Sequence, residues 1–282
     1  MSISQFCSDL GATLKSCVKI AVSSRYASIK RCGDSRPLVV MGNGPSLRKV
    51  LDDRPECLKS AALLSVNFAA NAPEFFELKP EYYVLADGVF FTPDANNAAL
   101  VKLYEAFLAI DWPMTLIVPH NYRHRLPQCI AANKNIKVST INAVGLEGFE
   151  WFQNLTYSHR IGMPRPRNVL IVSIVAGMWL GYKEMYIIGA DHSWMQTIAV
   201  DEQNRVISVQ PHFYKDSASE QKRVNAVYSN LHLHDIINSF YIAFRSYHRI
   251  LAWANKRGVA IYNSTPDSFI DAFPRRPLPG TL

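Results

Sequence analysis

Paired cysteines and clustered metal ligands are missing from this chain of 282 residues. An odd number of scattered thiols in a chain of this length argues against a disulfide scaffold. There is no Cys-x-x-Cys spacing and no Cys/His cluster, which argues against a structural zinc site. We therefore expect reduced thiols in a cytoplasmic protein. The five cysteines are Cys7, Cys17, Cys32, Cys57 and Cys129.

Long apolar runs are missing as well. The longest apolar-rich stretch extends from Val169 to Leu180 and is shorter than the run needed to span a bilayer. The first residues lack a basic start followed by a continuous apolar block, so a secretion signal is not expected. The sequence thus predicts a core helix at 169–180 and a cytoplasmic location, at most peripheral to the inner membrane.

Charged residues make up only 19% of the chain, whereas hydrophobic residues make up 49%, which is enough for one substantial core. The charge that is present is mostly positive, with a formal net charge of +7 and a pI near 9.1. A basic balance favours anionic partners such as nucleotides or a lipid surface. No interleaved basic and aromatic motif of a known nucleic-acid fold occurs, so nucleic acid is not an expected partner.

The first 36 residues differ from the rest and are expected to form an amphipathic basic helix. Apolar residues recur at helical spacing, and Lys15, Lys19, Arg25, Lys30 and Arg31 add positive charge. Such a helix can lie on an anionic membrane surface. It can equally pack against the main domain or against a second subunit in a homo-oligomer. The apolar positions are Phe6, Leu10, Leu14, Val18 and Ala21.

From Arg36 onward, apolar strand patterns alternate with helical patterns, which is typical of a doubly wound, mainly parallel α/β sheet. A helix is expected at Asn168–Leu180, a hairpin at Ala199–Val209 and further helix at Val224–Lys256. We assign residues 37–282 to a single α/β domain. The expected strands are Leu38–Met41, Leu63–Asn67, Tyr82–Ala86, Met114–Pro119, Ile136–Ile141, Met185–Gly189 and Ala260–Asn263.

The first expected strand runs directly into a Gly-rich turn formed by Gly42, Asn43, Gly44, Pro45 and Ser46. The glycines lack a Cβ, so the backbone can turn sharply and approach a ligand. Proline suits the first helical position, which needs no N–H. A strand, a Gly-rich turn and a helix start together predict a place that holds phosphate.

Polar or glycine residues also follow other expected strands. In open α/β sheets the carboxyl ends of the strands meet at one edge, and ligands bind in the crevice there. We therefore expect these residues to line one site with the Gly-rich turn. They are Asn67, the pair Asp87-Gly88, the pair Asp191-His192, and the pair Asn263-Ser264.

Two motifs together resemble those of the bacterial sialyltransferases of glycosyltransferase family 42. They are the turn from Gly42 to Leu47 followed by Val66-Asn67, and the segment Gly181-Tyr182-Lys183-Glu184 with its strand to Asp191. The chain is also similar to the wider superfamily of 6-hydroxymethylpterin diphosphokinase-like proteins and flagellin nonulosonate transferases. The resemblance covers about residues 37–273. It implies a Rossmann-like GT-A variant with a small helical lid at about 195–235.

The resemblance implies a nucleotide-sugar donor, most simply a CMP-linked one. The donor phosphate and ribose would lie at Asn43, Gly44 and Ser46, and the cytidine at Asn67. Asp87 with Gly88 stands where the family has a donor-binding asparagine. The family's Thr-Ser pair beside the donor sugar is replaced here by Arg167 and Asn168.

In the lid, the resemblance places a general base at His212 and phosphate contacts at Tyr214 and Lys215. From the residues alone, His192 beside Asp191 suits the base role on topology, since histidine titrates near neutrality. The base is therefore open between these two histidines, and Asp191 is a further candidate for binding the acceptor.

The expected reaction moves a sugar from the donor to a glycan or lipid-linked acceptor of a bacterial surface polysaccharide, with inversion implied by the resemblance. No Asp-x-Asp triplet occurs, so we expect no metal cofactor. One alternative is a phosphotransferase of the diphosphokinase type acting on a pterin alcohol, with Mg²⁺ held by Asp87 and Asp191. Another is a non-catalytic module that binds anions or nucleic acid.

Overall fold

The computed structural model describes residues 2–53, 55–208 and 231–280. Its centre is a seven-stranded sheet in the order β5-β4-β3-β2-β1-β6-β9, and every neighbouring pair is parallel. This confirms the predicted doubly wound α/β fold, with strand ends within one or two residues of those expected. The strands are β1 (Leu38–Met41), β2 (Ala62–Val66), β3 (Tyr82–Val84), β4 (Met114–Pro119), β5 (Ile136–Ile141), β6 (Glu184–Ile188) and β9 (Ala260–Asn263).

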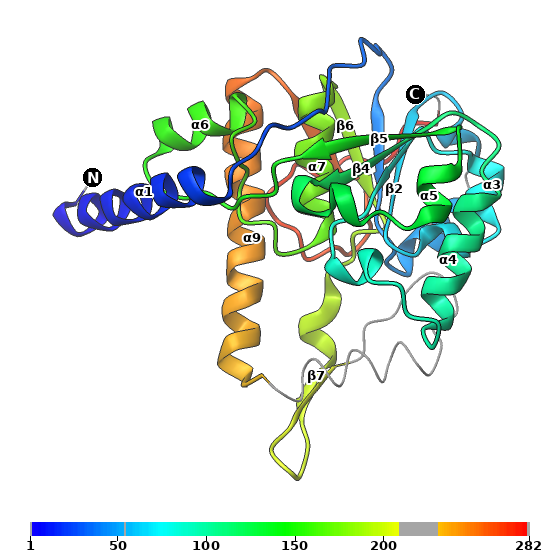
Figure 1. Ribbon diagram of the computed structural model, residues 1–282. Coiled ribbons are helices and arrows are strands. Elements are labelled where there is room, and N and C mark those ends of the chain that lie inside the picture. The colour runs from blue at the N-terminus through cyan, green and yellow to red at the C-terminus, as the bar shows by residue number, and fades with distance from the viewer. Residues whose placement is uncertain (1, 54, 209–230, 281–282) are drawn as a thin grey trace.

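The order of the strands creates a switch point beside β1. The chain adds β2 to β5 on one side of β1, and then returns to place β6 and β9 on the other side (Figure 1). The chain that leaves β1 therefore continues to β2 on one side, whereas the chain that leaves β6 continues to β9 on the other side. A crevice at the carboxyl ends of these two strands is the usual ligand site of such a sheet.

Helices cover both faces of the sheet. Leu38 and Val40 of β1 face the core formed with α7 (Val169–Leu180) and α9 (Leu233–Lys256), while Val39 and Met41 face α2 (Ser46–Asp53). Because side chains of a strand alternate between faces, each strand contributes to two cores. The second face continues under α3 (Glu74–Leu78), α4 (Ala98–Leu108) and α5 (Gln128–Ala132).

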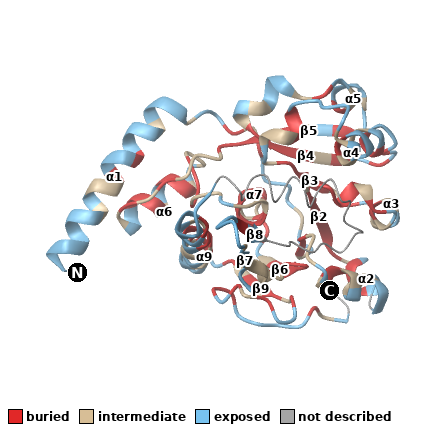
Figure 2. Ribbon diagram, turned by 90° about the horizontal axis from the view of Figure 1, so that it is seen from below, coloured by how far each residue is buried: buried red, intermediate tan, exposed pale blue. Residues whose placement is uncertain are grey.

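Helix α7 lies against the middle of the sheet and is buried on nearly every side (Figure 2). Asn168 caps its first turn by accepting a hydrogen bond from the Ile171 amide at 3.1 Å, and Gly181 ends it in the left-handed region at φ 103°. Gly177 lets the helix approach β1 and β6, since a Cβ there would lie 2.6 Å from both Leu38 and Met185. The all-apolar sequence of this segment therefore marks a core helix, as predicted.

Helix α1 (Ile3–Ser23) is present as expected, and it contacts the domain through its polar side. Thr13 and Ser16 are its buried residues; the Ser16 hydroxyl donates to the Glu147 carbonyl at 2.7 Å and accepts from the Glu147 amide at 2.9 Å. The apolar side, by contrast, is open to solvent. Its exposed side chains are Ile3, Phe6, Leu10, Leu14, Val18 and Val22.

The segment after α1 runs back over the sheet. Ala27 and Ile29 are buried in the core that contains α7, and the Ile29 amide donates to the Thr140 carbonyl at 3.2 Å. The predicted boundary at residue 36 therefore follows a stretch that is already part of the main core. No helix among those described combines the length and apolar character required for crossing a membrane.

The remaining elements join these strands and helices. The predicted hairpin is present as β7 (Ile198–Val200) and β8 (Val206–Ser208), paired antiparallel. Residues 209–230, which hold most of the predicted lid, lie outside the described ranges. The other elements are α6 (Glu150–Ser158), η1 (Pro55–Leu58), η2 (Ala69–Asn71), η3 (Gly88–Phe91), η4 (His120–Arg125) and η5 (Ser193–Thr197).

Candidate functional site

A cavity of about 480 Å³ opens at the carboxyl ends of β1, β2, β3 and β6. We call it the switch-point cavity, because it lies where the strand order reverses. Its size is within the range of small-molecule sites. The cavity brings together ten of the predicted residues: Gly42, Asn43, Gly44, Pro45, Asn67, Asp87, Arg167, Asn168, Asp191 and His192.

The Gly-rich turn is shaped by a close approach between the ends of β1 and β6. A Cβ on Gly42 would lie 2.4 Å from the Gly189 carbonyl oxygen, and a Cβ on Gly44 would lie 1.9 Å from Asp191 Oδ2. Gly189 itself has φ +63°, which favours glycine. The glycines are thus required by backbone packing between two strands, independently of any ligand.

Three amides of this turn, those of Gly42, Gly44 and Ser46, donate hydrogen bonds within the protein, and the predicted role of the turn in holding phosphate stays a prediction. Gly42 N–H donates to the Ile188 carbonyl and Gly44 N–H to the Gly189 carbonyl, both at 2.8 Å. Ser46 gives its amide to Asp191 Oδ1 at 3.2 Å and its hydroxyl to Asp191 Oδ2 at 2.7 Å. A carboxylate already occupies the position at the start of α2 where an anion would bind. Asp191 therefore caps α2 in this structure.

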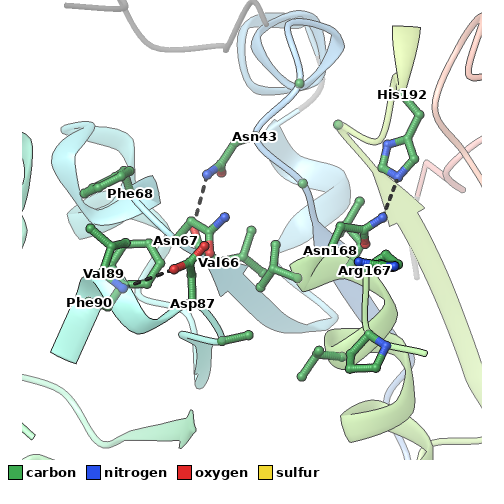
Figure 3. Close-up of a pocket in the computed structure, with 18 of the residues that line it drawn as sticks. Asn43, Val66, Asn67, Phe68, Asp87, Val89, Phe90, Arg167, Asn168 and His192 are labelled. Atoms are coloured by element: carbon green, nitrogen blue, oxygen red, sulfur yellow. Dashed lines mark hydrogen bonds between the residues drawn. The ribbon is translucent and has the colours of Figure 1, made fainter. Parts of the chain in front are cut away.

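Two asparagines of the cavity carry buried oxygens that lack a partner. Asn43 donates its Nδ2 to the Val66 carbonyl at 3.1 Å, which fixes the orientation of its amide (Figure 3). Asn67, with φ 52°, follows β2. Across the described ranges, Oδ1 of Asn43 and Oδ1 of Asn67 are buried and have no hydrogen-bond partner. Buried acceptors are rarely left unpaired, so these oxygens suit a ligand that brings N–H or O–H donors.

The wall beside Asn67 is apolar. Phe68 and Phe90 are buried, with their ring centroids 5.0 Å apart and their planes at 63°. Asp87 caps η3 by accepting from the Val89 amide at 3.1 Å and remains exposed (Figure 3). Gly88 adjoins the cavity without lining it. This side therefore combines an apolar surface with a carboxylate at the rim.

The opposite wall is a buried hydrogen-bond network between β6, α7 and α9. The Tyr247 hydroxyl donates to Asn168 Oδ1 at 3.0 Å and lies 2.6 Å from His192 Nε2. A neutral His192 that donates from Nε2 to the tyrosine oxygen satisfies this chain of groups. Asn168 Nδ2 lies 3.4 Å from the same nitrogen (Figure 3).

Complete burial of His192 lowers its pKa to about 3, because the charged ring would lose its hydration. A ring with so low a pKa is a weak base, and its Nε2 is engaged with Tyr247. The structure therefore favours a role for His192 in holding the cavity wall over the predicted role as general base. Burial likewise raises the pKa of the Tyr247 hydroxyl, so it stays protonated.

Arg167 provides positive charge at the mouth of the cavity. Its side chain is exposed and lies on the same side as Asn168 and His192 (Figure 3). No salt bridge to Arg167 occurs among the residues that the structure describes. It is thus available to an anionic group of a ligand. The other predicted phosphate contacts, Tyr214 and Lys215, and the predicted base, His212, lie outside the described residues.

Sequence reasoning missed several residues of the cavity. Asn121 and Tyr122 follow β4 and line the cavity, so the rule applied to the other strand ends could have found them. Tyr247 does not line the cavity itself but holds His192 and Asn168, which do; it lies in the middle of α9, and no local pattern marks it. Within the described part of the chain, no group of three or more His, Cys, Asp or Glu side chains could hold a metal ion.

Comparison with solved structures supports the fold. The MAf glycosyltransferase from Magnetospirillum magneticum AMB-1 aligns with 98% of this chain at 12% identity and a TM-score of 0.50. The chain spans 39% of the length of that protein. A mannonate dehydratase from Streptococcus suis serotype2 aligns over 69% of this chain and 56% of its own, at 14% identity and a TM-score of only 0.19, which carries no argument. No family model and no curated protein matches the sequence.

At this level of identity the first alignment is evidence about the fold alone. It supports the arrangement of a parallel sheet with flanking helices.

Proposed function

We propose that the chain is a glycosyltransferase that uses a nucleotide-activated sugar, most simply a CMP-linked one. The observation that carries the proposal is the pair of unpartnered, buried oxygens of Asn43 and Asn67 in a cavity at the switch point of the sheet. A nucleoside offers what these acceptors lack, since ribose hydroxyls and an exocyclic amine are hydrogen-bond donors. The glycosyltransferase-like fold adds independent support.

The two walls suggest how the donor lies. We place the nucleoside against Asn43, Asn67 and the apolar surface of Phe68 and Phe90. The phosphate and the sugar then point toward Arg167 and Asn168 on the other wall. Arginine suits this position because its guanidinium group binds phosphate and carboxylate oxygens with paired hydrogen bonds.

The reaction we propose is a direct displacement. The acceptor hydroxyl gives its proton to a base while its oxygen forms a bond to the anomeric carbon. The bond from that carbon to the donor phosphate breaks, and both electrons leave with the phosphate. Arg167 would stabilise the charge that develops there. His212 remains our proposed base, and full turnover by His212→Ala would disprove that assignment.

No observation favours the alternative phosphotransferase. Its two proposed magnesium ligands are engaged differently: Asp191 accepts two hydrogen bonds from Ser46, and Asp87 caps η3. The glycosyltransferase and the phosphotransferase are expected to bind different nucleotides. Thermal stabilisation by CMP without Mg²⁺ supports the transferase, whereas stabilisation only by ATP with Mg²⁺ would favour the phosphotransferase.

A sharper test uses Asn67→Gly. Glycine adopts the positive φ of this position without strain, so the variant removes the carboxamide and leaves the backbone undisturbed. Calorimetric titration should show CMP affinity reduced by about tenfold, the effect of one lost hydrogen bond. The matched control is Asn204→Gly, since Asn204 has φ 58° in the turn of the β7–β8 hairpin, away from the cavity. Equal CMP affinity in all three proteins would refute the proposed nucleoside site.

We further propose that the exposed apolar face of α1 rests on an anionic membrane surface. Trp151, which is 64% exposed, extends this face through Phe149, whose ring lies 5.4 Å from that of Phe6 and 6.4 Å from that of Trp151. Basic residues outnumber acidic ones in the first 36 residues by six to two. Like charge disfavours pairing with a second copy and favours anionic lipid.

A further inference from the structure

A second cavity, of about 710 Å³, lies between the end of α1 and the carboxyl ends of β4 and β5. We call it the basic cavity. Its lining includes the cationic side chains Lys19, Arg25, Arg165 and Arg167 together with His120, and no Asp or Glu of the described residues lines it. Such a concentration of one charge sign creates a positive potential that attracts anions.

The charges of the basic cavity are only partly balanced. Glu147 forms a salt bridge with Arg165 at 3.3 Å and a second one with Arg245. Its single negative charge is therefore shared between two arginines. Lys19 donates to the Gly145 carbonyl at 3.2 Å, and Arg25 donates to the Ser24 carbonyl at 2.8 Å. In the described ranges neither of these two cations, nor Arg167, forms a salt bridge with a carboxylate.

The chemistry of the lining favours a phosphate group over a second nucleoside. Backbone and side-chain polar groups surround the cations. Among the described residues that line the cavity, His120 has the only aromatic ring, so these residues offer no apolar platform for a base. His120 itself is turned toward the protein, with Nδ1 3.1 Å from the Tyr26 carbonyl oxygen. Guanidinium and ammonium groups that line one cavity with few carboxylate partners match the oxygens of a phosphate or diphosphate.

The two cavities adjoin each other. Asn121, Ala143, Pro166 and Arg167 line both of them. A molecule anchored in the basic cavity therefore reaches the wall on which we place the donor phosphate and sugar. Arg167 stands at this junction.

We infer that the basic cavity is the acceptor subsite, and that it binds an acceptor through a phosphate-bearing group. The acceptor role rests on the proposed function, whereas binding of a phosphate anion does not. Lys19 and Ser23 of α1, with Arg25 just beyond it, supply one wall. The N-terminal helix, which the resemblance to family 42 omits, would thus complete the site.

The test measures binding of inorganic pyrophosphate to the full-length chain by calorimetry, with and without saturating CMP. The double variant Lys19→Gln/Arg25→Gln removes two positive charges from the basic cavity and none from the switch-point cavity. The control Lys15→Gln/Lys30→Gln removes two charges from the same segment without touching either cavity. We expect the first variant to weaken pyrophosphate binding at least tenfold and the control less than twofold.

Equal weakening in both variants, or no pyrophosphate binding by the wild type, would overturn the inference. Arg25→Gln alone serves if the double variant fails to fold, because Arg25 is exposed and its hydrogen bond within the described ranges goes to the neighbouring Ser24 carbonyl. The proposed function is judged separately. Pyrophosphate binding without CMP binding would refute the donor site and support the anion site. CMP binding without pyrophosphate binding would refute the anion site and support the donor site.

Discussion

Helices α1 and α7 are both rich in apolar residues, yet the protein uses them in opposite ways. All but two residues of α7 are buried, and this helix fills the space above the sheet. In α1 only Thr13 and Ser16 are buried, and the apolar side chains point outward. An apolar stripe therefore predicts a helix without saying what the stripe will contact. In α1, specific hydrogen bonds from hydroxyl groups set the orientation.

The largest difference in the loss of stability is expected between alanine substitutions of two tryptophans. Trp179 of α7 is 3% exposed and donates its Nε1 to the Tyr157 carbonyl at 2.8 Å, whereas Trp151 beside α1 is 64% exposed. Trp179→Ala should lower the free energy of unfolding by about 3–5 kcal/mol through cavity formation. Trp151→Ala should change it by less than about 0.5 kcal/mol. Urea denaturation measures both, and similar losses would break the contrast.

The free energy of unfolding should also depend on pH through His192, which is buried beside Asn168 at the start of α7. Above pH 6.5 His192 is neutral in both folded and unfolded chains and contributes no pH dependence. Below that pH the unfolded chain binds a proton at His192, whereas the folded chain binds it only near pH 3. The free energy of unfolding therefore falls as the pH falls. The expected loss is about 2 kcal/mol by pH 5.

His192→Asn keeps a residue type that tolerates the positive φ and should flatten this slope. His159→Asn, at an exposed position, should leave it unchanged. Denaturation curves recorded from pH 7 to pH 5 check this, and an unaltered slope in His192→Asn would contradict the neutral ring.

A loss of stability of similar size, but confined to α1, is expected when the polar contact of this helix is removed. Ser16→Ala removes a hydroxyl that bonds to both the amide and the carbonyl of Glu147, and leaves those groups without their partner. The cost should be about 1–3 kcal/mol and should be local to α1. Hydrogen exchange would then show faster exchange in residues 3–23 with little change in α7. Ser8→Ala, at an exposed position on the same helix, is the control.

The smallest effect on stability is expected from the exposed apolar face of α1. Leu14→Glu/Val18→Glu should change the free energy of unfolding by less than about 0.5 kcal/mol, since both side chains are exposed. The same variant should lose binding to vesicles that contain anionic lipid, measured by co-sedimentation. Lys15→Gln should weaken binding only slightly. If the wild type sediments as a dimer that the double variant abolishes, and vesicle binding is absent, the membrane proposal fails.

The sequence predicts the sheet well because its central strands β1, β2 and β3 are buried on both faces and so read as short apolar runs. It also predicts that Asn43 and Asn67 line one cavity, since parallel strands bring their carboxyl ends to one edge of the sheet. The engagement of Ser46 with Asp191 was not predictable, because it joins residues far apart in the chain. The same holds for Tyr247 and for the approach of Lys19 and Arg25 to the cavity beside Arg167. These depend on how helices dock, which no local pattern encodes.

The carboxylate at the start of α2 has a consequence for selectivity. A chain with net charge +7 attracts every phosphate compound in its surroundings, and a bare helix start would add a general phosphate trap. Asp191 acts as a built-in counterion there, so the start of α2 adds no attraction for anions to that of Arg167. Under the proposed function, the cavity selects a ligand by the hydrogen-bond donors that the ligand offers to the carboxamide oxygens of Asn43 and Asn67. Abundant anions such as free phosphate would then be poor competitors, and the cavity would stay open to a scarcer nucleoside.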